Sequence, residues 1–300
     1  MPLEEAVEGD VSARDGLVKS HRFLAVNTAL PYIRGDEETI ARIEAFMQDE
    51  KLGVDIFALR AIVETKEEAH YALDKSRPTL VPGSEYEFDV VVRNKGVGHT
   101  FPGGTNDSNE GWLEVSVVGE DGEALVLSGA VQDDGHVDPA AHFYKALMVD
   151  KQGQAIHQRN AQDIVTAVYV RTIGPGTADI AHYSFRVPED YRGQQLTLKA
   201  RLLWRKFDRA YTEFAFNNNR QGFARFDQVP ELPVTEITRS EVALAVGGAS
   251  VSAAASEADW VRFNDYGIGL LLQDDTQGAA RAFATVARLV PKRLHGCRNL

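Results

Sequence analysis

Much of the chain alternates apolar and polar residues with a period of two, the pattern of half-buried β-strands. Tyr86, Phe88, Val90 and Val92 would face one side of such a strand, and the charged residues between them would face the other. Further short runs follow, separated by turn signals such as Asp121-Gly122: WLEVSVV, ALVLSGAV, HFYKALMV, IVTAVYVRTI, IAHYSFRV, LTLKARLLW and YTEFAF. The series predicts a mainly β fold, an antiparallel β-sandwich of immunoglobulin-like type with flanking helices.

Helical periodicity lies on both sides of the predicted sandwich. Residues 11 to about 50 are predicted to be helical, with Asp36 as an N-cap and Ile40, Ile43 and Met47 at helical spacing. Helical periodicity returns near the C-terminus. We therefore expect three parts: a helical N-terminal segment over 1–52, a β-sandwich domain over 53–228, and a connector with a helical hairpin over 229–300.

The C-terminal segment fits the pattern of a tetratricopeptide repeat. With Gly267 as the eighth position, the other signature positions hold acceptable residues: Phe263, Leu270, Ala279, Phe283 and Pro291. The chain then stops within what resembles a second repeat. Because such repeats bury their apolar faces by stacking on neighbours, we expect a truncated array with an open face, through which the chain could form oligomers. That face would comprise Leu270, Phe283 and Val286.

Charge and cysteine content exclude some classes of partner. A net charge of -12 argues against nucleic acid, which requires a dense basic face. No apolar run approaches the length of a membrane-spanning helix. Cys297 is the only cysteine, so the chain has neither an internal disulfide nor a CxxC or CxxCH motif. The acidic N-terminus lacks the layout of a secretory signal.

The loop VGHTFPGGTNDSNE, residues 97–110, concentrates side chains that can bind a ligand. Its glycines and proline permit tight turns, and loops of this kind on a β scaffold often carry function. The candidate ligand-binding residues are Thr105, Asn106, Asp107 and Asn109. The alternative is a polar crossover loop whose Asx and Ser groups cap their own backbone.

A second group of polar residues offers donors for a divalent metal ion. His136 and His142 lie near Asp134 and Asp138 in the sequence and provide nitrogen and oxygen ligands. Their spacing matches neither an EF-hand loop nor an HExxH helix. The alternative is that the aspartates cap turns.

No catalytic motif is present, so the chain is not predicted to be an enzyme. The sequence contains no GxSxG nucleophile elbow, no GxxxxGK phosphate loop and no GxGxxG after a strand. Acidic residues are numerous, but nothing in the sequence singles out a pair for acid and base catalysis.

Several segments together resemble one family: SHRFLAVNTALP, GHTFPGGTNDSNEGWLEV, DDGHVDPAAHFYKALMVDKQG and LLWRKFDRAYTEFAF, followed by the tetratricopeptide-like unit. Over residues 18–300 the chain resembles the part of multihaem c-type cytochromes that follows their CxxCH segments. The resemblance implies that His21, in the HRF segment, is a distal ligand to a haem bound elsewhere. His99 is a second candidate for cofactor binding, because imidazole binds haem iron.

The absence of CxxCH means that this chain cannot itself attach haem c covalently. The resemblance therefore implies a longer parent protein that carries the haems, and a periplasmic or otherwise extracytoplasmic location. The basic residues around LTLKARLLW are either a solvated strand face or a dock for an acidic group such as a haem propionate. They are Lys199, Arg201, Arg205, Lys206 and Arg209.

Two functions from different classes are expected. The first is the non-haem scaffold and docking region of a multihaem cytochrome, which supports electron transfer through an axial histidine and binds a haem-bearing domain or redox partner. The alternative is a free-standing immunoglobulin-like module that binds a small ligand or a divalent metal ion through its glycine-rich loop.

Overall fold

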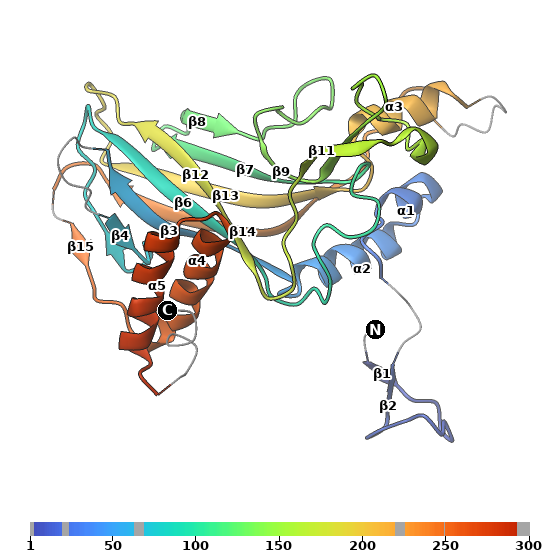
Figure 1. The fold of residues 1–300 in the computed structure, drawn as a ribbon, viewed down its shortest axis with the longest axis horizontal. Coiled ribbons are helices and arrows are strands. Elements are labelled where there is room, and N and C mark those ends of the chain that lie inside the picture. The colour runs from blue at the N-terminus through green and yellow to red at the C-terminus, as the bar shows by residue number, and fades with distance from the viewer. Residues whose placement is uncertain (1–2, 20–23, 63–68, 220–225, 249, 293–300) are drawn as a thin grey trace.

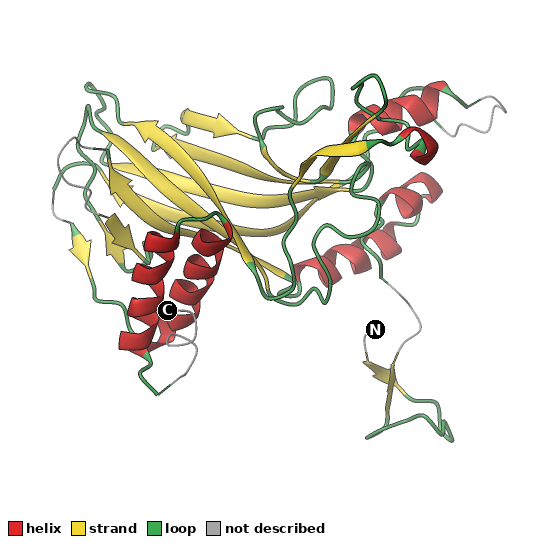
Figure 2. Ribbon diagram, viewed as in Figure 1, coloured by secondary structure: helices red, strands yellow, loops and turns green. Residues whose placement is uncertain are grey.

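Two antiparallel sheets pack face to face and form the body of the protein (Figure 1; Figure 2). The computed structural model describes residues 3–19, 24–62, 69–219, 226–248 and 250–292. The first sheet has the order β12-β6-β3-β4, and the second has the order β14-β13-β7-β8, with β9 also paired to β7. The predicted class, a mainly β antiparallel sandwich with flanking helices, is confirmed.

The strands of the two sheets have the following bounds. The first sheet comprises β3 (Leu52–Ala61), β4 (Ala69–Tyr71), β6 (Glu85–Asn94) and β12 (Ala178–Arg186). The second comprises β7 (Glu110–Gly119), β8 (Ala124–Ser128), β9 (His142–Tyr144), β13 (Gln195–Arg205) and β14 (Val234–Ala245).

Smaller elements lie outside the two main sheets. Three two-stranded pairs are formed by β1 (Leu3–Glu5) with β2 (Leu17–Lys19), β10 (Ala146–Val149) with β11 (Thr166–Val170), and β5 (Ser76–Arg77) with β15 (Val251–Ser252). Two short 3-10 helices are η1 (Ala161–Asp163) and η2 (Glu257–Asp259).

The core between the sheets follows the predicted alternation. On β13, Leu198, Ala200 and Leu202 are fully buried, while Lys199 between them is exposed. These residues face Phe88 of β6 and its apolar neighbours in one continuous cluster. Because β13 pairs with both β7 and β14, it is a central strand whose inner face is covered along its length.

Three local expectations are wrong. Residues 11–28 contain β2 and no long helix among those described. YTEFAF belongs to helix α3 (Arg209–Asn217), because Asp208 is an N-cap whose Oδ1 accepts from the backbone N–H of Tyr211 at 2.8 Å. The segment predicted as a connector, 229–300, contains β14, so the sandwich extends beyond 228.

The N-terminal helices cover one end of the sandwich (Figure 1). They are α1 (Ala29–Arg34) and α2 (Glu37–Gln48). The predicted cap is confirmed, since Asp36 accepts a hydrogen bond from the N–H of Thr39 at 3.0 Å. Gln48 Nε2 donates to the carbonyl of Glu236 on β14 at 2.9 Å, which attaches the end of α2 to the second sheet.

The C-terminal hairpin is formed by α4 (Trp260–Leu272) and α5 (Thr276–Leu289) and packs on the outer face of the first sheet (Figure 2). The rings of Phe263 and Tyr266 lie 5.0 and 4.9 Å from that of Phe57 on β3. Gly267 allows the two helices to approach, because a Cβ there would lie 2.6 Å from Phe283 Cε1. The hairpin is therefore the third layer of the fold.

The expectation of an open apolar face on this hairpin is wrong. The three residues named for it, Leu270, Phe283 and Val286, are at most 4% exposed. The sheet supplies the burial that a neighbouring repeat would give in a solenoid. Among the described residues, no helix is long and apolar enough to cross a membrane.

Phe283→Ala is expected to lower the free energy of unfolding of the whole protein by about 3–5 kcal/mol, because the substitution opens a cavity where the ring is buried between the helices. Leu272→Ala, at a 63% exposed position of the same hairpin, is the control and should change stability by less than about 0.5 kcal/mol. Chemical denaturation measures both. An unchanged main transition in the Phe283 variant would mean that the hairpin unfolds independently of the sheet.

Candidate functional site

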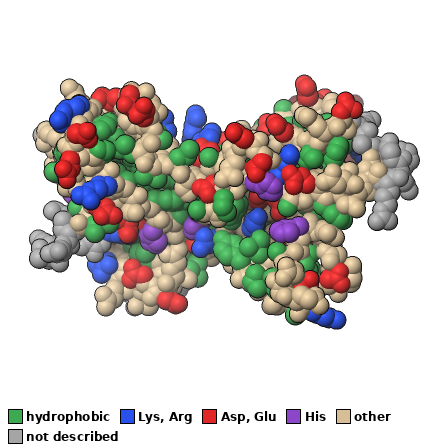
Figure 3. Space-filling view, turned by 90° about the horizontal axis from the view of Figure 1, so that it is seen from above, with side chains coloured by type: hydrophobic (Ala, Val, Ile, Leu, Met, Phe, Trp, Pro, Cys, Tyr) green, Lys and Arg blue, Asp and Glu red, His purple; other side chains and the backbone are tan. Residues whose placement is uncertain are grey.

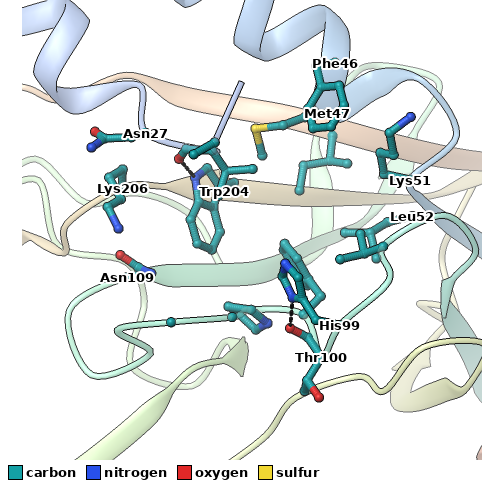
Figure 4. Close-up of a pocket in the computed structure, with 18 of the residues that line it drawn as sticks. Asn27, Phe46, Met47, Lys51, Leu52, His99, Thr100, Asn109, Trp204 and Lys206 are labelled. Carbon is teal, nitrogen blue, oxygen red and sulfur yellow. Dashed lines mark hydrogen bonds between the residues drawn. The ribbon is translucent and has the colours of Figure 1, made fainter. Parts of the chain in front are cut away.

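A cavity of about 870 Å³ lies beside the glycine-rich loop (Figure 4). Loop residues 96–106 form one wall, and the segment 24–27 with the end of α2 forms another. Trp204, at the end of β13, lies in the middle of the labelled side chains. Segments distant in the sequence thus meet around one space whose size is typical of sites for small molecules and cofactors.

The base of the loop is fixed by Asn94, the last residue of β6. Its fully buried side chain donates from Nδ2 to the carbonyls of His99, at 3.0 Å, and Ile173, at 3.2 Å. Its Oδ1 accepts from the N–H of Val97 at 3.0 Å. Because the backbone on either side of His99 is held in this way, the position of that residue is set by the sheet.

The apolar walls come from both sheets and from α2. Trp204 is fully buried, and its indole N–H donates to the carbonyl of Val26 at 3.0 Å, which holds segment 24–27 against the cavity. The ring of Phe101 packs on Trp204 with centroids 5.5 Å apart. Met47 and Leu52 complete the apolar lining.

His99 lies at the cavity with one ring nitrogen engaged. Its Nδ1 lies 2.8 Å from the carbonyl oxygen of Thr100, so Nδ1 carries the proton and donates (Figure 4). Nε2 has no hydrogen-bond partner among the described residues, and in this tautomer it keeps a free lone pair. A Cβ on Gly103 would lie 2.6 Å from His99 Cε1, so the absence of a side chain there makes room for the ring.

One end of the cavity is polar. Lys206 and Asn109 face each other there, and Asn27 lies on the same side (Figure 4). Asn109 is 2% exposed, and its Oδ1 has no hydrogen-bond partner in the described part of the chain; the same holds for Oδ1 of Asn106. Burial lowers the pKa of Lys206, as does the nearby charge of Arg159.

The structure brings together three of the four predicted ligand-loop residues. Thr105, Asn106 and Asn109 line the cavity, whereas Asp107 does not, although its charge raises the pKa of Lys206. The capping alternative accounts for a weak bond from Ser108 Oγ to the Thr105 carbonyl, at 3.3 Å. It leaves the amide oxygens of both asparagines without partners.

The four predicted metal ligands are not gathered into one group. Asp134 Oδ1 accepts from the backbone N–H of His136 at 2.9 Å, and the Asp138 carboxylate accepts from two backbone N–H groups. His142 bonds instead to Asp179, at 2.7 Å. In the described residues these aspartates behave as turn caps, as the alternative interpretation expected.

A charged cluster that the sequence did not indicate lies where the hairpin meets the first sheet. Glu87, Asp89 and His182 are close enough to share a cation, but Arg60 already bridges the two carboxylates. Arg60 contacts both oxygens of the fully buried Asp89 at 2.9 Å. Asp89 also accepts from the hydroxyl of Tyr266 on α4, at 2.6 Å.

The hydrogen bonds of His182 define its protonation. Gln273 Nε2 donates to the carbonyl of Ile180 at 2.7 Å, so its Oε1 faces His182 Nε2 at 3.2 Å. His182 Nδ1 lies 2.7 Å from Asp89 Oδ1. Since both ring nitrogens face acceptors, the surroundings favour the doubly protonated imidazolium. The hydrogen bond to Asp89 raises the pKa of His182, against the effect of burial.

His21 lies outside the described residues, so the structure does not place it.

Lys206 was noted in the sequence only as part of a basic cluster, and the members of that cluster have different environments. Lys199 is exposed, whereas Arg205 is buried and paired with Glu110. The face drawn in Figure 3 shows basic and acidic side chains intermingled.

No protein-family model and no curated protein matches the chain. Among solved structures it is similar to a penta-haem cytochrome c552 from Thermochromatium tepidum, with 14% identity, a TM-score of 0.43, and coverage of 67% of this chain and 41% of that chain. It is also similar to the C-terminal domain of Wzt, with 11% identity, a TM-score of 0.26 and coverage of 68% and 82%. The chain spans about two fifths of the cytochrome's length. None of these likenesses bears on function.

His182→Gln is expected to destabilise the protein most at acidic pH. The folded-state pKa of His182 is raised above its ordinary value of 6.5, so its contribution is fully present below that value and is lost as the pH rises through the folded-state pKa. The difference in unfolding free energy between wild type and variant should therefore shrink from pH 5.5 to 9 in denaturation curves. His157→Gln, at an exposed loop position, is the control. A difference independent of pH would contradict the imidazolium assignment.

Proposed function

We propose that this chain is the haem-free scaffold of a multihaem c-type cytochrome, and that its large cavity receives the open face of a haem carried by a partner or preceding segment. The observation that carries the proposal is His99, whose Nε2 lone pair is free at an apolar cavity. Under this proposal the partner of the chain is a haem-bearing polypeptide. The role of the chain is docking and ligation rather than catalysis. An extracytoplasmic location follows from the attachment chemistry of haem c.

The residues of the cavity fit a haem. The rings of Phe101 and Trp204, with Met47 and Leu52, provide the apolar surface that a macrocycle requires. His99 donates from Nδ1 to a backbone carbonyl, and a bond of this kind orients metal-ligating histidines and fixes the tautomer that binds iron. Haem iron would supply the electron transfer.

The chain's own contribution is to hold the ligand and to exclude water. Asn94 fixes the backbone around His99, so little freedom remains to be lost when the imidazole binds. Trp204 ties segment 24–27 to the second sheet and so closes one wall. In the sequence, His21 stands three residues before Leu24 of that wall, and it is the second candidate ligand.

The alternative function, a free-standing module for a small ligand, is favoured by the two unpartnered amide oxygens of Asn106 and Asn109 in the same cavity. These groups would serve any ligand with hydrogen-bond donors. Under this alternative an imidazole ligand is not required, so His99 should be dispensable for binding. The two functions are therefore separated by the role of His99.

A haem c peptide that contains one CxxCH segment tests the proposal, because its own histidine occupies one axial position and the other is open. Mixing it with the chain should convert the spectrum from high-spin to six-coordinate low-spin, saturably with protein concentration. His99→Ala should abolish this change, whereas His157→Ala, at an exposed loop position outside the cavity, should not alter it. Absorption spectroscopy is the measurement.

Three outcomes can be told apart. Loss of the low-spin spectrum in His21→Ala but not in His99→Ala would transfer the axial role to His21. Binding of the peptide without any change of spin state, equal in both variants, would contradict ligation by this chain and favour the small-ligand module. No binding at all by the wild type would contradict the proposed function.

A further inference from the structure

We propose that the polar end of the large cavity binds a carboxylate of the occupant, held by the ammonium of Lys206 and the amide of Asn109. This inference rests on the proposed function, under which the carboxylate is a haem propionate. It names a binding role for two residues at the end of the cavity, in addition to the ligating histidine.

The alternation of β13 explains why a cation points into an apolar cavity. Trp204 and Lys206 are two residues apart and both line the cavity, whereas Arg205 between them is turned to the other side. There Arg205 pairs with Glu110 and donates to the carbonyl of Gly135 at 2.8 Å. Trp204 and Lys206 thus present an apolar surface followed by a positive charge, which suits a ligand that is apolar with an anionic edge.

Among the described residues, Lys206 lacks the carboxylate partner that Arg60 and Arg205 have. In the part of the chain that the structure describes, its ammonium has no hydrogen bond or ion pair, and it lies 5.2 Å from the centroid of the Phe207 ring. Burial disfavours its charged form and lowers its pKa. A carboxylate in the cavity would stabilise that charge and form a charge-assisted hydrogen bond.

Asn109 is an independent indication of a ligand. Its side chain is 2% exposed, lines the cavity, and its Oδ1 lacks a hydrogen-bond partner within the described chain. Buried polar groups in native proteins are almost always satisfied, so this amide is expected to bond to a ligand through its oxygen or its NH₂ group. Because no hydrogen bond fixes the amide, it can turn its NH₂ group towards an anion held by Lys206.

The charges around this end favour one carboxylate. Arg159 adds positive potential to that of Lys206, and Asp107 opposes it. Asp107 does not line the cavity, so it does not occupy the space in front of the ammonium. The end of the cavity therefore has a net positive character despite the chain's overall charge of -12.

The test is a double-mutant cycle between protein and ligand. The probes are iron protoporphyrin with free propionates and its dimethyl ester, which has the same apolar body without the anionic charges. Wild type should bind the free acid about 10–100-fold more tightly than the ester, as one charge-assisted hydrogen bond allows. Lys206→Gln should lose that preference while keeping its affinity for the ester. Quenching of tryptophan fluorescence measures both affinities.

Two further variants sharpen the experiment. Lys199→Gln removes the same charge from the exposed face of β13 and should keep the preference for the free acid. Asn109→Asp places a carboxylate in front of Lys206 and should abolish the preference, because the ammonium is then paired within the protein. Circular dichroism checks that each variant is folded.

Equal affinity of the wild type for the two probes would overturn the carboxylate site. An equal loss of affinity for both probes in Lys206→Gln would also overturn it. Neither result would affect the low-spin spectrum of the haem c peptide, which depends on His99. The proposed function would therefore survive. If the wild type binds neither probe, both the carboxylate site and the proposed function are contradicted. This outcome is recognised by the absence of any low-spin signal with the haem c peptide.

Discussion

The alternation of β13 is the constraint on which the other features depend. It is a central strand, paired on both sides, so each of its side chains must face either the core or an outer surface. Where the strand leaves the sheet, Trp204 reaches the cavity and Arg205 reaches Glu110, at the first position of β7. The ion pair fixes the exit of the glycine-rich loop, and the indole fixes segment 24–27. The end of one strand thus organises two distant segments.

Local patterns predicted the sandwich well where tertiary contacts agree with them. The alternation from Tyr86 to Val92 and the cap at Asp36 describe interactions within a few residues, and both are present in the structure. Helix α3 was mistaken for a strand because its aromatic residues also suit a strand, and the cap at Asp208 decides between the two. The hairpin was placed correctly, but the layer that covers it is a sheet whose strands β3, β6 and β12 are distant from it in the sequence.

The candidate site was predictable in part. The loop at 97–110 was identified from its composition, and Asn106, Asn109 and His99 do line the cavity. The opposite wall comes from α2 and β13, and no local pattern indicates that these segments meet the loop. The four proposed metal ligands are not brought together in the described structure, since the side chains of Asp134 and Asp138 accept hydrogen bonds from nearby backbone N–H groups.

The distribution of buried charge separates the framework from the site. Arg60 is paired with Asp89 and Glu87, Lys75 with Asp259, and Arg205 with Glu110, so each of these cations is neutralised within the chain. Such pairs hold elements together but leave no charge available to a ligand, because breaking one exposes an unpaired buried ion. Lys206 differs from them in lacking a carboxylate partner among the described residues. A carboxylate partner would stabilise the charge of Lys206. The cavity in front of this lysine is the space in which a ligand could supply that carboxylate.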